Sequence, residues 1–66
     1  MVITLNGKEM TFNEHLSIGD FLKTKDIHPD SVVVELNRNI IQTEHYDNTS
    51  VKDKDVLEIL RFVGGG

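Results

Sequence analysis

The pair Asn6-Gly7 separates two short segments in which apolar and polar residues alternate. Both residues tolerate the positive φ angles of a tight two-residue turn, and the pair is the strongest short-range signal for a β-hairpin. Residues 1–5 alternate with the period of a half-buried strand, and residues 10–12 resume the alternation after the turn. The chain is therefore predicted to begin with an antiparallel hairpin.

A helix is predicted after the hairpin. Ser17 is placed to cap the backbone N–H of Asp20, and the Ser-x-x-Asp spacing is a form of capping box. Ile18, Phe21 and Leu22 follow the spacing of one helical face. Pro29 ends this region, because the residue before a proline avoids the helical basin.

The second half of the chain is predicted to be mostly strand. Strands are expected over residues 31–37, 40–41 and 56–63, with one helical turn over 44–48. The order hairpin, helix, strand, strand, strand predicts an α+β fold of the β-grasp (ubiquitin-like) kind. This fold has a mixed sheet of four to five strands with one main helix packed across it. We expect one domain over residues 1–63 and a flexible Gly-Gly-Gly tail over 64–66.

Composition limits the classes of function. With Cys 0 in 66 residues, disulfides and thiolate zinc sites are excluded, so the core must rely on ordinary apolar side chains. Lys+Arg 7 against Asp+Glu 11 gives a net charge of −4, which disfavours nucleic-acid and membrane-surface binding. The negative net charge favours a partner protein with a basic docking face. The sequence shows neither the pattern of a secretory leader nor that of a membrane-spanning segment, so we expect a cytoplasmic protein.

Candidate catalytic and metal-binding residues are scarce. The sequence does not show the residues that nucleophilic catalysis needs, since there is no cysteine and no spacing that suggests a Ser-His-Asp triad. His15, His28 and His45 lack the close spacing of a zinc motif and are interpreted as surface residues. We therefore expect a chain that is not an enzyme, with no catalytic residues, no metal site and no bound cofactor.

The three terminal glycines offer a different chemistry. Without Cβ atoms, Gly64 and Gly65 can thread a channel too narrow for other residues, and the α-carboxylate of Gly66 arrives at its far end. An ionised carboxylate can attack the α-phosphorus of ATP inside a partner enzyme that holds the phosphates with Mg²⁺. A frayed end and an artificial addition are the competing explanations for the glycines.

Partner docking is expected beside this tail. In the last strand, Leu60 and Phe62 lie on the face opposite Leu57 and Ile59, and Val33 of a neighbouring strand extends the same face. These three outward residues, Leu60, Phe62 and Val33, are called the docking patch below. Either loops of the same chain cover the docking patch, or it is exposed and marks an interaction site.

Nearly the whole chain resembles the ThiS family, the sulfur carriers of thiamine thiazole biosynthesis. The matching segments are Leu5-Asn6-Gly7, Ile18 through Leu22, Val34-Glu35-Leu36-Asn37, Ile40-Ile41, Tyr46, Asp55 through Ile59 and the ending Phe62-Val63-Gly64-Gly65-Gly66. Lys54 departs from the family pattern, in which glycine often lies between two aspartates. If this position needs a positive φ, lysine there costs about 1 kcal/mol of stability.

The resemblance implies a protein co-substrate. An E1-like adenylating enzyme would use ATP and Mg²⁺ to adenylate Gly66, and sulfur from a cysteine desulfurase would convert Gly66 to a thiocarboxylate. Thiazole synthase would then take the sulfur. The carrier itself would bind no cofactor and would be a monomer when free.

Other functions remain open at the level of the sequence. The small subunit of molybdopterin synthase is similar in fold and also ends in Gly-Gly. A ubiquitin-like modifier would use the same tail with a lysine acceptor, and a non-covalent β-grasp binding module would not use the tail at all.

Overall fold

The computed structural model describes residues 1–13 and 15–62. In chain order the elements are β1 (Val2–Leu5), β2 (Lys8–Thr11), β3 (Leu16–Ser17), α1 (Ile18–Thr24), the 3₁₀ helix η1 (Pro29–Ser31), β4 (Val32–Leu36), β5 (Asn39–Ile41), the 3₁₀ helix η2 (Thr43–Asn48), β6 (Ser50–Val51) and β7 (Val56–Arg61). The predicted hairpin, helix, late helical turn and three later strands are all present. The tail, residues 64–66, lies outside the described residues, as does Val63 at the predicted end of the last strand.

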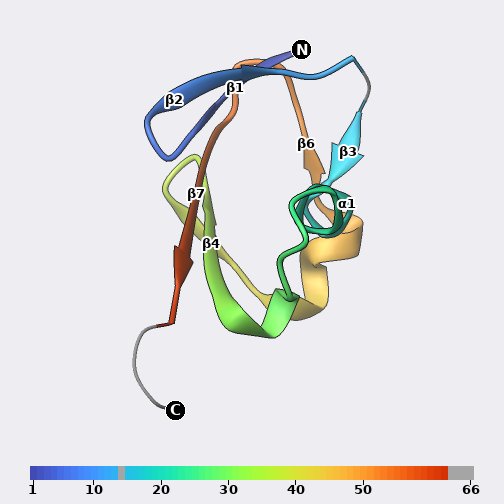
Figure 1. Cartoon of the computed structure of the whole chain (residues 1–66), viewed down its shortest axis with the longest axis vertical. Helices are drawn as coiled ribbons and strands as arrows, with labels where there is room; N and C mark the ends of the chain where they lie inside the picture. The colour runs from blue at the N-terminus through green and yellow to red at the C-terminus, as the bar shows by residue number, and fades with distance from the viewer. Residues whose placement is uncertain (14, 63–66) are drawn as a thin grey trace.

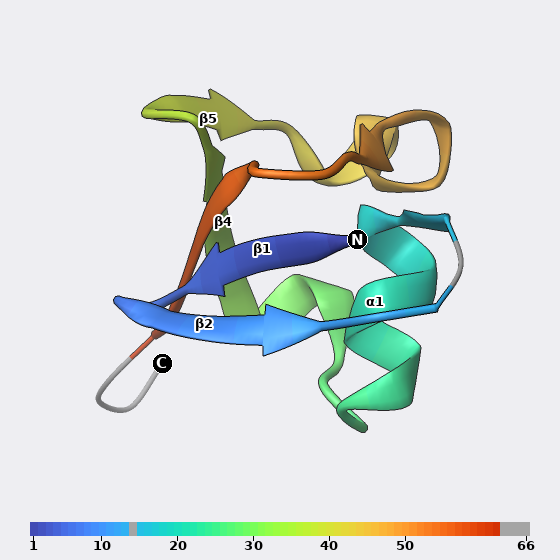
Figure 2. The ribbon, with the colours of Figure 1, turned by 90° about the horizontal axis from the view of Figure 1, so that it is seen from above.

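The main sheet has the strand order β2-β1-β7-β4-β5. β1 and β7 are parallel neighbours, whereas the β1–β2, β4–β7 and β4–β5 pairs are antiparallel. The helix α1 lies across one face of this sheet, as the two views in Figures 1 and 2 show. The prediction of a mixed sheet with one main helix across it is confirmed, and the sheet has five strands.

The core lies between the sheet and α1. Its buried residues come from the sheet, from α1 and, in the case of Tyr46 and Val51, from η2 and β6: Ile3, Ile18, Phe21, Leu22, Val32, Val34, Tyr46, Val51, Leu57 and Ile59. Along β7 the side chains alternate, with Leu57 and Ile59 buried and Val56, Glu58 and Leu60 exposed. One face of the central strand therefore belongs to the core, and the opposite face is open to solvent.

Both ends of α1 are closed by local hydrogen bonds. At the start, the Ser17 hydroxyl accepts from the Asp20 backbone N–H at 3.0 Å, as predicted. At the end, Asp26 takes a left-handed conformation with φ 57°, and its N–H donates to the Lys23 carbonyl oxygen. The N–H of Ile27 donates to the Leu22 carbonyl oxygen, which completes a Schellman motif. The helix therefore ends at Thr24, earlier than the position of Pro29 suggests.

A second, two-stranded sheet joins the start of the helix to the late part of the chain. β3 pairs antiparallel with β6, with Leu16 opposite Val51, and the Ile18 N–H donates to the Thr49 carbonyl oxygen at 2.9 Å. This pairing brings η2 against α1, where Gly19 faces Asp47 so closely that an added Cβ would meet the Asp47 carboxylate. Strands of two residues are too short to show a periodicity, so this sheet was not predicted from the sequence.

Candidate functional site

The end of β7 is held firmly in the sheet. Antiparallel pairing with β4 places Leu60 opposite Val33 and Arg61 opposite Val32. Beyond the strand, the Phe62 N–H donates to the Ser31 carbonyl oxygen at 3.1 Å. The main chain is thus tied to the domain up to Phe62. The strand β7 runs away from the end of the molecule at which the N-terminus lies (Figure 1). Gly66 follows four residues later, within about 14 Å of Phe62 when the chain is extended.

The docking patch is exposed. Leu60 is 56% exposed and Phe62 is 64% exposed, while Val33, directly opposite Leu60, is half-buried. Of the two expected arrangements, the structure has the exposed one, since loops of the described chain do not cover Leu60 and Phe62. The docking patch therefore lies directly beside the point where the chain leaves the sheet.

Two carboxylates lie next to the docking patch on the same face. Glu58 of β7 is directly opposite Glu35 of β4, and the exposed Ile40 of β5 is opposite Glu35. Like charges in directly opposed positions of an antiparallel pair destabilise a sheet. The alternation within each strand puts both glutamates on the outer face, but their direct opposition depends on the register and was not recognised in the sequence.

The histidines are separated in the structure. His15, His28 and His45 are all exposed, and the His28 Nδ1 accepts from the Asp30 backbone N–H at 3.2 Å. Within residues 1–13 and 15–62, no three His, Asp or Glu side chains are grouped in a way that would hold a metal ion. Across the same residues, no helix is both long and apolar enough to cross a membrane.

The turn before β7 contains the departure from the expected family pattern. Lys54 has φ 70°, in the left-handed region that favours glycine. Its N–H donates to the Val2 carbonyl oxygen at 2.6 Å, which fixes this conformation against β1. Lys54 therefore has the positive φ at which lysine is less stable than glycine by about 1 kcal/mol.

A mixed five-stranded sheet crossed by one helix, with an apolar outer patch at the end of the central strand, defines a ubiquitin-like β-grasp protein. The model of the ThiS family matches residues 3–66. The chain belongs to the ThiS family.

Individual relatives agree with this assignment. Sulfur carrier protein ThiS of Bacillus subtilis (strain 168) is 38% identical over 66 residues, covering 98% of this chain and 100% of the relative. The crystal structure of thiamine biosynthesis protein ThiS from Geobacter metallireducens is similar with a TM-score of 0.86 and 39% identity over the whole of both chains. Thiazole synthase of Paramagnetospirillum magneticum (strain ATCC 700264 / AMB-1) is 33% identical over 66 residues, which cover 100% of this chain but only 20% of that enzyme.

Proposed function

We propose that this chain is a sulfur carrier protein of thiamine biosynthesis, acting as a protein co-substrate and not as a catalyst. The observation that carries the proposal is the family match over residues 3–66, which includes both the docking patch and the three terminal glycines. The full-length similarity to a sulfur carrier protein of Bacillus subtilis supports it. The free carrier is proposed to be a cytoplasmic monomer.

The reacting group is the α-carboxylate of Gly66. In the active site of an E1-like adenylating enzyme, one carboxylate oxygen attacks the α-phosphorus of ATP, and pyrophosphate leaves. The sulfur of a persulfide, supplied through a cysteine desulfurase, then attacks the acyl carbon, and AMP leaves. A thiol reduces the resulting acyl disulfide, which yields the thiocarboxylate and a new disulfide. ATP and Mg²⁺ belong to the partner, and the carrier binds no cofactor of its own.

The body of the carrier supplies the docking energy. Ordering the tail in a channel costs about 1–2 kcal/mol per residue, so contacts elsewhere must offset this cost. Leu60, Phe62 and Val33 form the apolar contact, and Glu35 and Glu58 beside them favour a partner face that carries basic side chains. Gly64 and Gly65 thread the channel because they have no side chains to obstruct it.

Thiazole synthase is the proposed acceptor of the sulfur. In Paramagnetospirillum magneticum, one fifth of a thiazole synthase matches the whole of this chain, so a carrier-like segment and the synthase share one polypeptide there. This arrangement supports the thiamine pathway over a molybdopterin-synthase role.

The proposal is tested by intact mass spectrometry. The chain is incubated with a cognate adenylating enzyme, Mg-ATP and a persulfide donor, and Gly66 is expected to exchange one oxygen for sulfur. Transfer of that sulfur into a thiazole by thiazole synthase assigns the pathway, whereas transfer only to a molybdopterin precursor contradicts it. A branched lysine adduct would instead indicate a ubiquitin-like modifier. An unchanged mass would contradict both covalent roles and favour a non-covalent binding module.

A further inference from the structure

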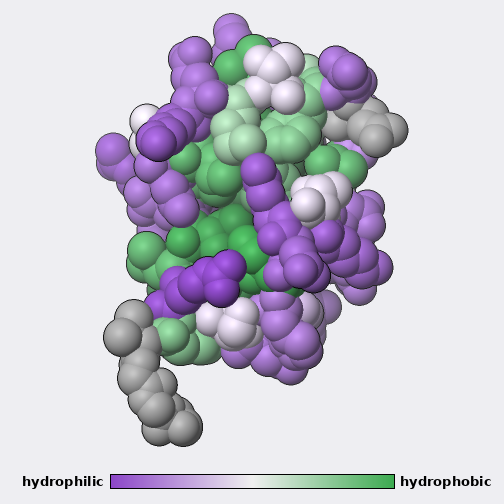
Figure 3. All heavy atoms as spheres, viewed as in Figure 1, coloured by the Kyte–Doolittle hydropathy of each residue, from purple (hydrophilic) through white to green (hydrophobic). Residues whose placement is uncertain are grey.

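A pocket opens between the end of α1 and the inner face of β7. Its volume is about 180 Å³, and its apolar wall consists of Leu5, Phe21, Ile27 and Ile59. In the space-filling view, apolar side chains are visible in this region between hydrophilic side chains that reach over them (Figure 3). An apolar cavity of about 150 Å³ is large enough to take up benzene, so this pocket has room for one bulky apolar side chain.

The pocket walls are fixed by hydrogen bonds within the chain. Ile27 is placed by the Schellman motif, in which its N–H donates to the Leu22 carbonyl oxygen at 2.9 Å. On the other side, the Asn6 amide makes two hydrogen bonds to the backbone of Ile59. Each polar atom of this amide makes one hydrogen bond to Ile59, so Asn6 holds the wall of the pocket in place. The pocket is therefore preformed, which lowers the cost of binding.

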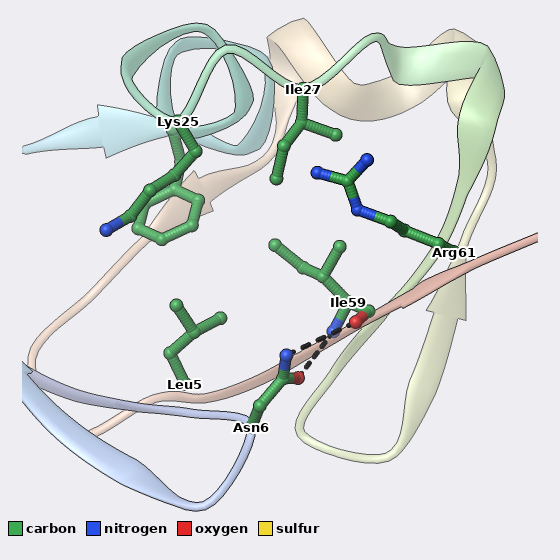
Figure 4. A pocket seen from close by; sticks show the side chains of 7 residues that line it. Leu5, Asn6, Lys25, Ile27, Ile59 and Arg61 are labelled. Atoms are coloured by element: carbon green, nitrogen blue, oxygen red, sulfur yellow. Dashed lines mark hydrogen bonds between the residues drawn. The ribbon is translucent and has the colours of Figure 1, made fainter.

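Two cationic side chains, Lys25 and Arg61, flank the apolar wall on different sides. Figure 4 shows Lys25 reaching over it from the end of α1 and Arg61 from the end of β7. The Lys25 Nζ lies 6.0 Å from the centre of the Phe21 ring. Among residues 1–13 and 15–62, neither cation forms an ion pair with a carboxylate. Asp26, the next residue after Lys25, lines a separate hollow with Lys23 and His28.

We propose that this pocket binds an acidic segment of a partner protein. One bulky apolar side chain of the segment fills the cavity, and the carboxylate of an adjacent residue lies between Lys25 and Arg61. Charge complementarity selects this occupant, because two cations flank an apolar cavity in a chain whose net charge is −4. The pocket is on the face of β7 opposite the docking patch, so both surfaces can be occupied at once and this proposal is independent of the sulfur-carrier function.

The test is an NMR titration of the ¹⁵N-labelled full chain with the blocked dipeptide acetyl-Leu-Glu-amide. We expect a dissociation constant of about 1 mM, consistent with the size of the probe. Shifts should be concentrated at the backbone amides of Asn6, Lys25, Ile27, Ile59 and Arg61, while those of Val33 and Leu60 remain unchanged. Acetyl-Leu-Gln-amide, which lacks only the charge, should bind about fivefold more weakly.

Variants separate the pocket from general charge effects. Lys25→Gln and Arg61→Gln should each weaken binding of the glutamyl probe about two- to threefold, because each removes one exposed charge pair. Lys23→Gln, on the same helix but outside the pocket, is the matched control and should leave the affinity unchanged. Equal binding of the two dipeptides, or an absence of shifts in the pocket at saturating millimolar concentration, would overturn the proposal. Shifts produced there by unlabelled carrier would assign the pocket to a second copy of the chain and would also overturn it.

Discussion

The side-chain amide of Asn6 and the backbone of Ile59 are joined by two hydrogen bonds. The Ile59 N–H donates to the Asn6 Oδ1 at 2.9 Å, and the Asn6 Nδ2 donates to the Ile59 carbonyl oxygen at 3.3 Å. The Asn6 main-chain N–H also donates to the Leu57 carbonyl oxygen at 3.0 Å. The asparagine side chain thus continues the parallel β1–β7 pairing beyond the end of β1 and fastens the first hairpin to the central strand.

Replacing Asn6 should destabilise the domain through this contact. Asn6→Ala is expected to lower the free energy of unfolding by about 2 kcal/mol, because two partly buried hydrogen bonds are lost and φ 48° strains alanine. Urea denaturation measures the loss. Asn6→Gly is the matched control, since glycine adopts positive φ without strain but lacks the amide. If Asn6→Gly were as stable as the original chain, the amide contact would have no role in stability.

The turn before β7 offers a stabilising substitution. Lys54→Gly should raise the free energy of unfolding by about 0.5 kcal/mol, since the left-handed conformation at φ 70° costs lysine about 1–2 kcal/mol and glycine adds about 0.5–1 kcal/mol of chain entropy. Lys52→Gly is the control in the same turn. Lys52 has no positive φ, so its replacement brings only the entropic cost and should destabilise. A loss of stability in both variants would mean that Lys54 is not strained.

Much of the fold was predicted from local signals in the sequence. The Asn6-Gly7 turn was predicted because its residue types match its dihedral angles, which are positive at both positions. The Ser17 cap was predicted for a similar reason, since the group that it satisfies lies three residues away. The alternation in the last strand also identified Leu60 and Phe62 as outward residues, which their exposure confirms.

Other features of the structure were not predicted from the sequence. The opposition of Glu35 and Glu58 follows from the β4–β7 register, which alternation alone does not determine. The β3–β6 sheet joins two-residue segments that are too short for a period. The end of α1 was not predicted, because the left-handed position that follows the helix is occupied by Asp26 and not by the glycine that usually marks a helix end. The pocket between Lys25 and Arg61 depends on that helix end and was missed with it.

Phe62 should matter more for partner binding than for folding. Phe62→Asp is expected to weaken binding to the adenylating enzyme by about tenfold or more, as for an aromatic anchor of an interface. Its effect on the free energy of unfolding should stay within about 0.5 kcal/mol, because the side chain is 64% exposed. Val56→Asp, at an exposed position near the start of β7, is the control for a new charge on the same face. Comparable losses of binding in the two variants would contradict a role specific to the docking patch.

The position of the terminal carboxylate provides the most direct test of the sulfur-carrier proposal. A single tryptophan added after Gly66 would move the carboxylate by about 3.5 Å and place a bulky side chain directly after the three glycines. Adenylation, measured as pyrophosphate release by the cognate enzyme, should fall to background, because the nucleophile no longer reaches the α-phosphorus and the channel is obstructed. The melting temperature should not change, since the sheet is already closed at Phe62 by its hydrogen bond to Ser31. Removal of the tryptophan by a carboxypeptidase should restore adenylation, which distinguishes obstruction from damage to the fold. Undiminished pyrophosphate release from the extended chain would show that Gly66 is not the group that is activated.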